Sequence, residues 1–248
     1  MATPISDKKY ALVTGGTSGI GLSIVQTLLS EGFYVAINYA ANIERAKEVQ
    51  TQLEVNHLGQ FSIVQGDLSN LTIIQPFVQE LLDITPNFDV LVFNAGQTDR
   101  SPFGEITPED WNRVLNANLS VPFFLTQSLY PYLSESASIT FIGSLMGIRP
   151  HAMSVSYGVS KAAVHALTEN LVKHVEEKKI RVNAVAPGFV NSPWQKNKPA
   201  HIVENINKKV ALHRFAECKE IANAVFFLIK NEYMNGEILK IDGGYSYQ

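Results

Sequence analysis

The chain has 248 residues, of which 46% are hydrophobic and 17% are charged, a balance typical of a folded globular protein. Its formal net charge of −3 offers no electrostatic attraction for nucleic acid or for an anionic membrane, so neither is expected as a partner. The single cysteine, Cys218, excludes an intrachain disulfide and a zinc site built from several thiolates.

Targeting and metal-binding signals are not found in the sequence. No run approaches the ~20 apolar residues that a membrane-spanning helix requires. The first residues, Met1 to Lys9, contain no apolar signal-peptide segment, so we expect a cytoplasmic protein. The six histidines are scattered without the spacing of metal ligands, so no metal site is expected.

Short aliphatic and β-branched runs alternate with helical patterns along the chain. Strands are expected at Tyr10–Thr14, Phe33–Asn38, Phe61–Gln65, Val90–Asn94, Ile139–Gly143, Ile180–Ala186 and Ile238–Ile241. Several of these runs are apolar throughout, which is typical of strands that helices cover on both faces. The order predicts an α/β fold, a single Rossmann-type doubly wound parallel sheet of about seven strands with helices on both faces.

The pattern predicts one domain, because linkers, repeats and low-complexity tracts are not found in residues 1–248. One long helix is expected to begin at Thr107–Asp110, which offers an N-cap, a proline at the first helical position and acidic residues in the first turn. The least regular stretch is 190–211, which contains Pro193 and Pro199. This stretch is the candidate for a mobile substrate flap.

The first strand leads into a glycine-rich turn that opens an amphipathic helix. The turn reads Thr14-Gly15-Gly16-Thr17-Ser18-Gly19-Ile20-Gly21. Glycines let the backbone approach a pyrophosphate, and the helix N-terminus offers free N–H groups and a partial positive charge. The spacing departs from the common G-x-G-x-x-G fingerprint, and a purely structural turn is the alternative, but the strand–turn–helix context favours a dinucleotide site.

Tyr157 and Lys161 are four residues apart, so a helix places both on one face. A phenol has an unperturbed pKa near ~10, and a neighbouring ammonium lowers that pKa toward the range useful for proton transfer. Ser144 follows an apolar strand, at the sheet edge where doubly wound folds bind ligands. Taken alone, the pair is more typical of a helix surface and Ser144 of a strand-end cap.

Together these features resemble the short-chain dehydrogenase/reductase family. The T-G-x-x-x-G-x-G turn, Asn94-Ala95-Gly96 and the Tyr157/Lys161 pair stand in the family's order, although Phe93 replaces the first Asn of the usual N-N-A-G. The resemblance implies a catalytic tetrad of Asn118, Ser144, Tyr157 and Lys161, in which Asn118 anchors a water that connects Lys161 to solvent. It implies NAD(P)H-dependent reduction of a carbonyl, with hydride from the nicotinamide and a proton from Tyr157.

The resemblance also indicates which residues hold the cofactor. Asp67 and Leu68 correspond to the pair that contacts adenine. Pro187 and Gly188 stand where the family lines the nicotinamide pocket, and Ser192 stands where a hydroxyl commonly holds the carboxamide. The expected cofactor set is Gly15, Thr17, Ser18, Gly19, Ile20, Gly21, Asn38, Tyr39, Asp67, Leu68, Asn94, Ala95, Gly96, Tyr157, Lys161, Pro187, Gly188, Val190 and Ser192.

We expect NADP(H) in preference to NAD(H). The second strand ends in Asn38-Tyr39-Ala40-Ala41-Asn42, without the acid that would bind the ribose hydroxyls and repel a 2′-phosphate. This stretch resembles that of NADPH-using members. However, Ser18 occupies the place where many NADP-dependent members carry an Arg, and Arg45 is the nearest cation after the strand.

Within the family, the chain is most similar to β-ketoacyl-acyl carrier protein reductases, so a 3-oxoacyl-thioester reductase is expected, with an acyl carrier protein as one candidate partner. Those reductases commonly present basic residues just before the fifth strand, where Tyr132–Ser138 holds an acid and no base. Lys178 and Lys179 would form the other half of a basic patch. The alternatives are a small-molecule carbonyl reductase or a sugar, polyol or alcohol dehydrogenase and, less favoured, a non-catalytic dinucleotide-binding regulator.

The family usually assembles as tetramers or dimers through the helices after strands four and five and through the C-terminal strand. We therefore expect a homotetramer or a dimer. Four side chains between Ser144 and Tyr157 are expected to touch substrate or to pack beside it: Met146, Arg149, His151 and Met153.

Overall fold

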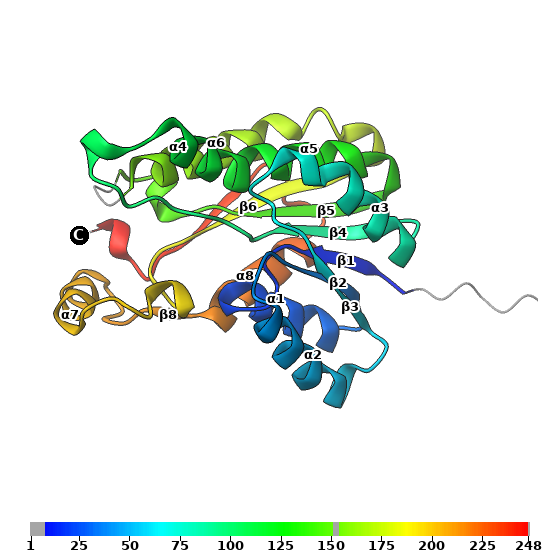
Figure 1. The fold of residues 1–248 in the computed structure, drawn as a ribbon, viewed down its shortest axis with the longest axis horizontal. Helices are drawn as coiled ribbons and strands as arrows, with labels where there is room; N and C mark the ends of the chain where they lie inside the picture. Colours follow the sequence, from blue (N-terminus) through cyan, green and yellow to red (C-terminus); the bar gives the residue numbers. More distant parts are fainter. Residues whose placement is uncertain (1–7, 151–153, 248) are drawn as a thin grey trace, which may run out of the picture.

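A seven-stranded parallel sheet lies at the centre of the molecule, as the computed structural model of residues 8–150 and 154–247 shows (Figure 1). Its strands are β1 (Tyr10–Val13), β2 (Tyr34–Tyr39), β3 (Phe61–Gln65), β4 (Phe88–Phe93), β5 (Leu133–Ile142), β6 (Arg181–Pro187) and β9 (Ile238–Ile241). The spatial order is β3-β2-β1-β4-β5-β6-β9. The predicted doubly wound α/β fold and all seven predicted strands are confirmed.

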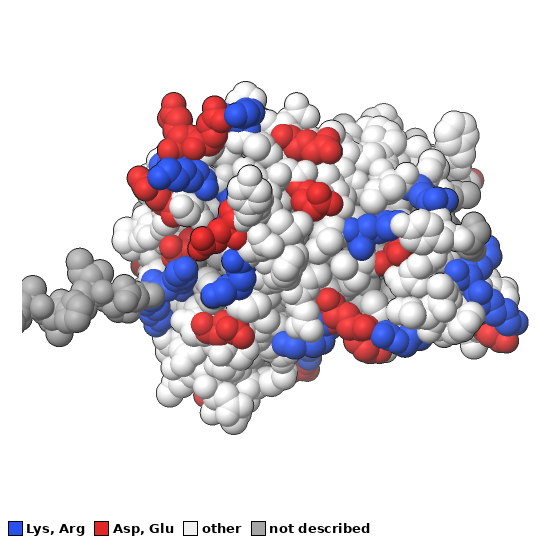
Figure 2. All heavy atoms as spheres, turned by 180° about the vertical axis from the view of Figure 1, so that it is seen from behind, with Lys and Arg blue, Asp and Glu red and all other residues white. Residues whose placement is uncertain are grey.

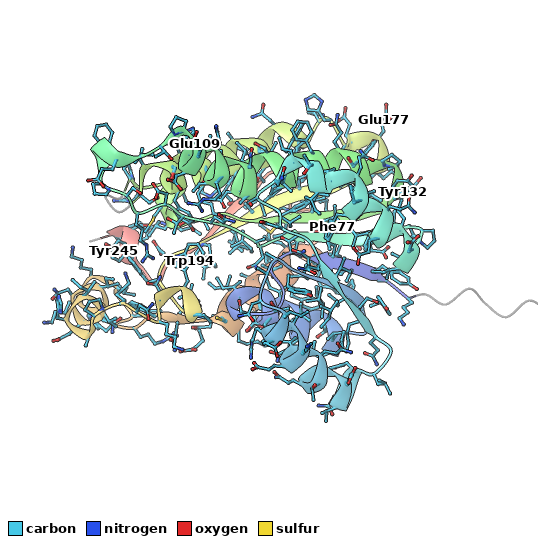
Figure 3. All side chains as sticks on the ribbon, viewed as in Figure 1. Phe77, Glu109, Tyr132, Glu177, Trp194 and Tyr245 are labelled. Atoms are coloured by element: carbon cyan, nitrogen blue, oxygen red, sulfur yellow. The ribbon has the colours of Figure 1, made fainter. Side chains whose placement is uncertain are left out.

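Helices cover both faces of the sheet (Figure 1). On one face lie α3 (Ile74–Ile84), α4 (Pro108–Leu115), α5 (Val121–Leu129) and α6 (Val155–Leu171), and on the other lie α1 (Gly19–Ser30), α2 (Ile43–His57) and α8 (Cys218–Lys230). Successive residues of one strand enter opposite cores: Leu91 belongs to the same core cluster as Phe77 of α3, which Figure 3 labels, whereas Val92 belongs to the cluster of Val25 of α1. This is why the strands are apolar throughout rather than alternating.

The strand order creates a crevice between β1 and β4. The chain passes from β1 outward through β2 and β3, and then returns to β4 on the opposite side of β1. Loops that follow β1 and β4 therefore leave the sheet in opposite directions, and the carboxyl ends of these strands form the ligand-binding edge of such a sheet. In Figure 1 this edge faces left, toward α7 (Ala200–Lys209) and the C-terminal residues.

Two expected elements differ in detail from the prediction. β5 begins six residues earlier than the predicted strand, since its first part is polar and exposed and gave no apolar signal. The helix expected from Thr107 is confirmed as α4, whose N-cap Thr107 Oγ1 accepts a hydrogen bond from Asp110 N at 3.1 Å. It continues into α5 through a π-helical segment, Asn116–Ser120.

The segment predicted as a flap contains regular structure. It begins with β7 (Val190–Asn191), continues through a 3₁₀ turn at Pro193–Gln195, and includes α7. β7 pairs with β8 (Ala216–Glu217) in a small parallel ribbon, which two-residue strands are too short to reveal in a sequence pattern. The mobility of this segment stays a prediction. Within the described ranges, none of the helices combines the length and apolarity needed to cross a membrane.

Candidate active site

Side chains from three elements converge at the carboxyl ends of β4 and β5. Asn118 comes from the π-helical segment, Ser144 follows β5, and Tyr157 and Lys161 lie in the first turns of α6. A Cβ placed on Gly96, in the loop after β4, would lie 3.1 Å from Asn118 Oδ1 and 3.7 Å from Lys161 Nζ. The structure thus brings the four predicted tetrad residues into one buried cluster beside that loop.

Local hydrogen bonds hold Tyr157 at the start of α6. Ser154 caps the helix, and its Oγ accepts a hydrogen bond from Tyr157 N at 3.3 Å. Ser160 Oγ donates to the carbonyl oxygen of Tyr157 at 2.8 Å. Both backbone polar groups of Tyr157 are therefore occupied, which fixes the origin of the phenol side chain.

The surroundings of the Tyr157 phenol favour its protonated form. Burial raises its pKa above the ordinary value, and a hydrogen bond from the Ser144 hydroxyl lowers it by a smaller amount. Burial is the largest influence on this pKa, and the expected lowering of the phenol pKa by Lys161 stays a prediction. Lys161 Nζ lies 5.7 Å from the centre of the Tyr157 ring.

Lys161 carries its ammonium in the interior. Its Nζ donates a hydrogen bond to the carbonyl oxygen of Ile142, at the end of β5, at 2.6 Å. Burial lowers the pKa of Lys161 to about 8. The side chain is therefore a cation at neutral pH that loses its proton within an accessible pH range.

Ser144 is oriented so that its hydroxyl proton remains free. Its Oγ accepts a hydrogen bond from Met146 N at 3.1 Å. Because this contact uses an oxygen lone pair, the hydroxyl hydrogen can be donated to Tyr157 or to a substrate oxygen. The predicted strand-end cap and the predicted catalytic contact are thus compatible functions of one side chain.

Asn118 joins the loop after β4 to α6. Its Oδ1 accepts from Gln97 N at 2.7 Å, and its Nδ2 donates to Gln97 O at 2.9 Å and to Ser160 Oγ at 2.8 Å. π-Helical segments widen a helix locally and often occur at functional sites. The amide is fully engaged with protein groups, and its predicted anchoring of a water stays a prediction.

The glycine-rich turn after β1 has the geometry of a phosphate cradle. Gly15 and Gly19 have φ of +62° and +52°, in the region that side chains disfavour. A Cβ on Gly21 would lie 2.2 Å from the carbonyl oxygen of Gly15. Ser18 precedes α1 without capping it through its side chain, so the first N–H groups of α1 are available to a ligand.

Two asparagines, the buried Asn38 and the half-buried Asn94, brace this turn with their side chains. Asn94 Nδ2 donates to Thr14 O at 2.9 Å and to Gly15 O at 3.1 Å. Asn38 Oδ1 accepts from Gly15 N at 3.3 Å, and its Nδ2 donates to Gly66 O at 3.1 Å. The side-chain amides of Asn94 and Asn38 therefore shape the cradle, a more indirect role than the contact the sequence suggested.

A groove runs from the turn along the carboxyl ends of β2, β1 and β4. It encloses about 330 Å³, and its walls include Gly15, Asn38, Asp67, Leu68, Ala95 and Gly96. These are predicted cofactor residues, and the missing side chains of the glycines leave the groove open. The cradle and groove fit a dinucleotide: the N-terminus of α1 would hold its pyrophosphate, and groove residues such as Asp67 and Leu68 would hold its adenosine.

The base of the flap lies against the same turn. A Cβ on Gly19 would meet Ser192 Cβ and Pro193 Cδ, each at 3.4 Å. Gly188 packs closely on Asp242, where a Cβ would lie 2.9 Å from Asp242 Cα. The other predicted cofactor residues flank these groups: Thr17 in the turn, Ile20 on α1, Tyr39 at the end of β2, Pro187 at the end of β6 and Val190 in β7.

Two further residues enter the site beyond the predicted set. Trp194, in the first turn of the flap, places its ring 6.0 Å from the Tyr157 ring and stays half-exposed (Figure 3). Arg45 Nε donates to Thr17 O, in the phosphate turn, at 3.1 Å. Only the position of Trp194 two residues after Ser192 could have indicated it, and Arg45 was noted in the sequence solely as the nearest cation.

The segment between Ser144 and Tyr157 is described in part. Met146 is half-buried and Arg149 exposed, both beside the site. His151 and Met153, which were also expected near substrate, lie outside the described residues.

We predict that Gly21→Ala weakens NADPH binding by about tenfold or more, because the new Cβ would collide with backbone that cannot yield without opening the cradle. Titration of the purified protein by NADPH fluorescence measures this change. Gly104→Ala is the matched control, since a Cβ there meets no atom within 4 Å. Equal dissociation constants for the two variants would contradict the cradle assignment.

Comparisons with known proteins agree with this geometry. The family model for short chain dehydrogenases matches residues 9–202. The 3-oxoacyl-[acyl-carrier-protein] reductase FabG of Staphylococcus aureus is 32% identical over 240 residues, which cover 95% of this chain and 97% of that protein.

Solved structures extend the likeness to three dimensions. A short-chain dehydrogenase/reductase from Serratia marcescens superposes with a TM-score of 0.89 at 31% identity, over 96% of this chain and 98% of its own. Pseudomonas aeruginosa RhlG, solved as an active-site complex with NADP, gives a TM-score of 0.89 at 30% identity over 99% of both chains. The chain therefore belongs to the short-chain dehydrogenase/reductase family, whose members are NAD(P)-dependent oxidoreductases acting on CH–OH and C=O groups.

Proposed function

We propose that this protein reduces a ketone with NADPH, that Tyr157 donates the proton, and that the substrate is a 3-oxoacyl thioester. The observation that carries the proposal is the half-buried Tyr157 between the Ser144 hydroxyl and the Lys161 side chain, beside the groove lined by the predicted cofactor residues. A bound nicotinamide dinucleotide would supply the hydride.

Three side chains of the protein position the substrate oxygen, donate the proton and stabilise the charge that remains. Ser144 donates a hydrogen bond to the carbonyl oxygen and holds it beside the Tyr157 hydroxyl. Tyr157 transfers its proton to that oxygen as negative charge develops there. Lys161 then stabilises the resulting phenolate, a role that its short bond to Ile142 O orients.

Tyr157→Phe tests the proposal directly. We expect kcat for acetoacetyl-CoA reduction to fall by roughly 10²–10⁴-fold, the usual contribution of a general acid, while NADPH still binds. The loss of NADPH absorbance measures the rate. Tyr233→Phe is the control, because Tyr233 is fully exposed. Normal turnover by the Tyr157 variant would exclude Tyr157 as the proton donor.

The pH dependence of kcat provides a second test. Since burial lowers the pKa of Lys161 to about 8, its positive charge is complete well below that pH and is lost as the pH rises through it. The pKa of Tyr157 is raised, so the phenol keeps its proton over the same interval. We expect kcat at saturating NADPH to decline above about pH 8. A rate that stays constant to about pH 10 would contradict the role of the ammonium.

Arg45 supports the preference for NADPH. Its bond to Thr17 O anchors the guanidinium at the phosphate turn, on the side where β2 ends without an acid. A guanidinium suits the planar, bidentate recognition of a phosphate. RhlG, which shares this fold, was solved with NADP.

We predict that Arg45→Ala raises the KM for NADPH by about tenfold or more and leaves the KM for NADH nearly unchanged, because only NADPH carries the 2′-phosphate. Steady-state kinetics with both cofactors measure the effect. Lys47→Ala is the control, since Lys47 is on the same helix, exposed and paired with Glu44. Equal changes for the two cofactors would contradict the assignment.

The thioester substrate is supported by similarity to FabG, and one contact favours an alternative. Lys178 Nζ donates to the carbonyl oxygens of Tyr130, Pro131 and Leu133 at 3.0, 2.9 and 2.9 Å. Its three donors are thus used within the chain. Separately, the face of the molecule that Figure 2 shows carries interspersed acidic and basic side chains and, among the residues described, no continuous basic patch. An acidic carrier protein would find little attraction there, which favours a free thioester or another small ketone as the second candidate.

Assembly is proposed from the surfaces that the fold leaves apolar. Phe124 of α5 and Val155 and Val159 of α6 are each more than one-third exposed. The edge strand β9 keeps its residues partly exposed as well. These surfaces support the proposed homotetramer or dimer.

A further inference from the structure

His165 is a buried titratable residue that the proposed chemistry does not use. It lies on α6 one turn beyond Lys161 and is 8% exposed. Its Nε2 accepts a hydrogen bond from Ser144 N at 3.4 Å. The side chain therefore reaches from α6 to the backbone of the residue proposed to hold the substrate oxygen.

The end of β5 explains why Ser144 requires this partner. Gly143 N donates to Val185 O at 2.8 Å, which is the last hydrogen bond between β5 and β6. The next N–H, that of Ser144, has left the strand ladder and is buried, where a missing acceptor is costly. The carbonyl oxygen of Ser144 accepts from Gly147 N at 3.0 Å. With His165 in place, both backbone polar groups of Ser144 are fixed.

The turn after β5 is shaped around the imidazole. A Cβ on Gly143 would lie 2.2 Å from His165 Nε2, and a Cβ on Gly147 would lie 2.8 Å from His165 Cε1. Because both residues are glycines, the His165 ring occupies the space that a side chain would fill at either position. Such close packing on two sides leaves the imidazole one position, with Nε2 directed at Ser144.

The protonation state of His165 allows its Nε2 to accept the hydrogen bond from Ser144 N at all times. An N–H can only donate, so Nε2 carries the lone pair and Nδ1 carries the proton. Burial and the nearby charge of Lys161 lower the pKa of His165 to about 4. The imidazole is therefore neutral at any pH at which the enzyme would work, unlike an exposed histidine.

We propose that His165 is a positioning residue, which fixes the backbone of Ser144 so that the Ser144 hydroxyl faces Tyr157. The assignment rests on the proposed function, in which Ser144 holds the substrate oxygen. His165 touches neither substrate nor cofactor in this scheme. Its contribution passes entirely through Ser144.

Three substitutions of His165 distinguish the effect of losing the hydrogen bond to Ser144 N from the effect of changing the side-chain volume. Glutamine can place an oxygen near the position of Nε2, asparagine is polar but too short to do so, and leucine fills the space without an acceptor. We expect His165→Leu and His165→Asn to lower kcat by about tenfold, the consequence of an unsatisfied buried N–H, with little change in KM or in NADPH affinity. His165→Gln is expected to restore most of the rate. If all three variants keep wild-type kcat, the proposal is wrong.

A double-mutant cycle with Ser144 distinguishes positioning from general structural support. If His165 acts through Ser144, His165→Leu in a Ser144→Ala background causes no further loss of kcat. Should the two losses multiply instead, His165 supports the fold and not the Ser144 hydroxyl. Thermal midpoints of all variants are measured alongside, and the Gln–Asn pair provides the comparison if the leucine variant does not fold.

The cycle also keeps this inference separate from the proposed function. Full activity of Tyr157→Phe would overturn the proposed chemistry whatever His165 does. Full activity of Ser144→Ala would remove the role through which His165 is proposed to act. A loss in both of those variants, combined with normal kcat in His165→Leu, would overturn the His165 assignment alone.

Discussion

The interior ammonium of Lys161 is the constraint on which the site depends. A buried charge is costly unless hydrogen bonds compensate for its lost hydration. In the described part of the chain its hydrogen-bond acceptor is the carbonyl oxygen of Ile142, at 2.6 Å, and no carboxylate takes that place. Because this acceptor belongs to the end of a central strand, the charge is coupled to the most rigid layer of the molecule. The helix α6 must lie close to that strand end, and Tyr157 is carried with it.

The neighbouring side chains also form hydrogen bonds with main-chain groups around the site. Asn118 binds both polar groups of Gln97, Asn94 binds the carbonyl oxygens of the phosphate turn, and His165 binds the N–H of Ser144. In each case one side chain, buried for Asn118 and His165 and half-buried for Asn94, satisfies main-chain groups that have left regular structure. A site built this way is organised before ligands arrive, so little reorganisation accompanies the reaction.

Sequence patterns predicted the strands, the sheet and the shared helix face of Tyr157 and Lys161, because burial on two faces and helical spacing leave local signals. Asn118 and Ser144 were assigned only through the resemblance to the family. Other features depend on contacts between segments far apart in the chain, and no local pattern carries them. The bond of Arg45 to Thr17 and the contact of Trp194 with Tyr157 are of this kind. The effect of burial on the phenol pKa is also of this kind, since spacing reports proximity but not burial.

In the proposed scheme, the groups that transfer the proton and the wall that faces the substrate belong to different elements of the fold. The proposed proton-transfer groups lie on α6 and at the end of β5, whereas the wall beside Tyr157 comes from Trp194 in the flap. An identity of 32% spread over the whole chain therefore informs on the scaffold and its reaction more than on the ligand. A half-exposed indole beside the phenol presents an apolar face to whatever the Ser144 hydroxyl holds. Selectivity for the carbonyl substrate should accordingly follow the residues of the flap, and the rate of proton transfer should follow the buried cluster beneath it.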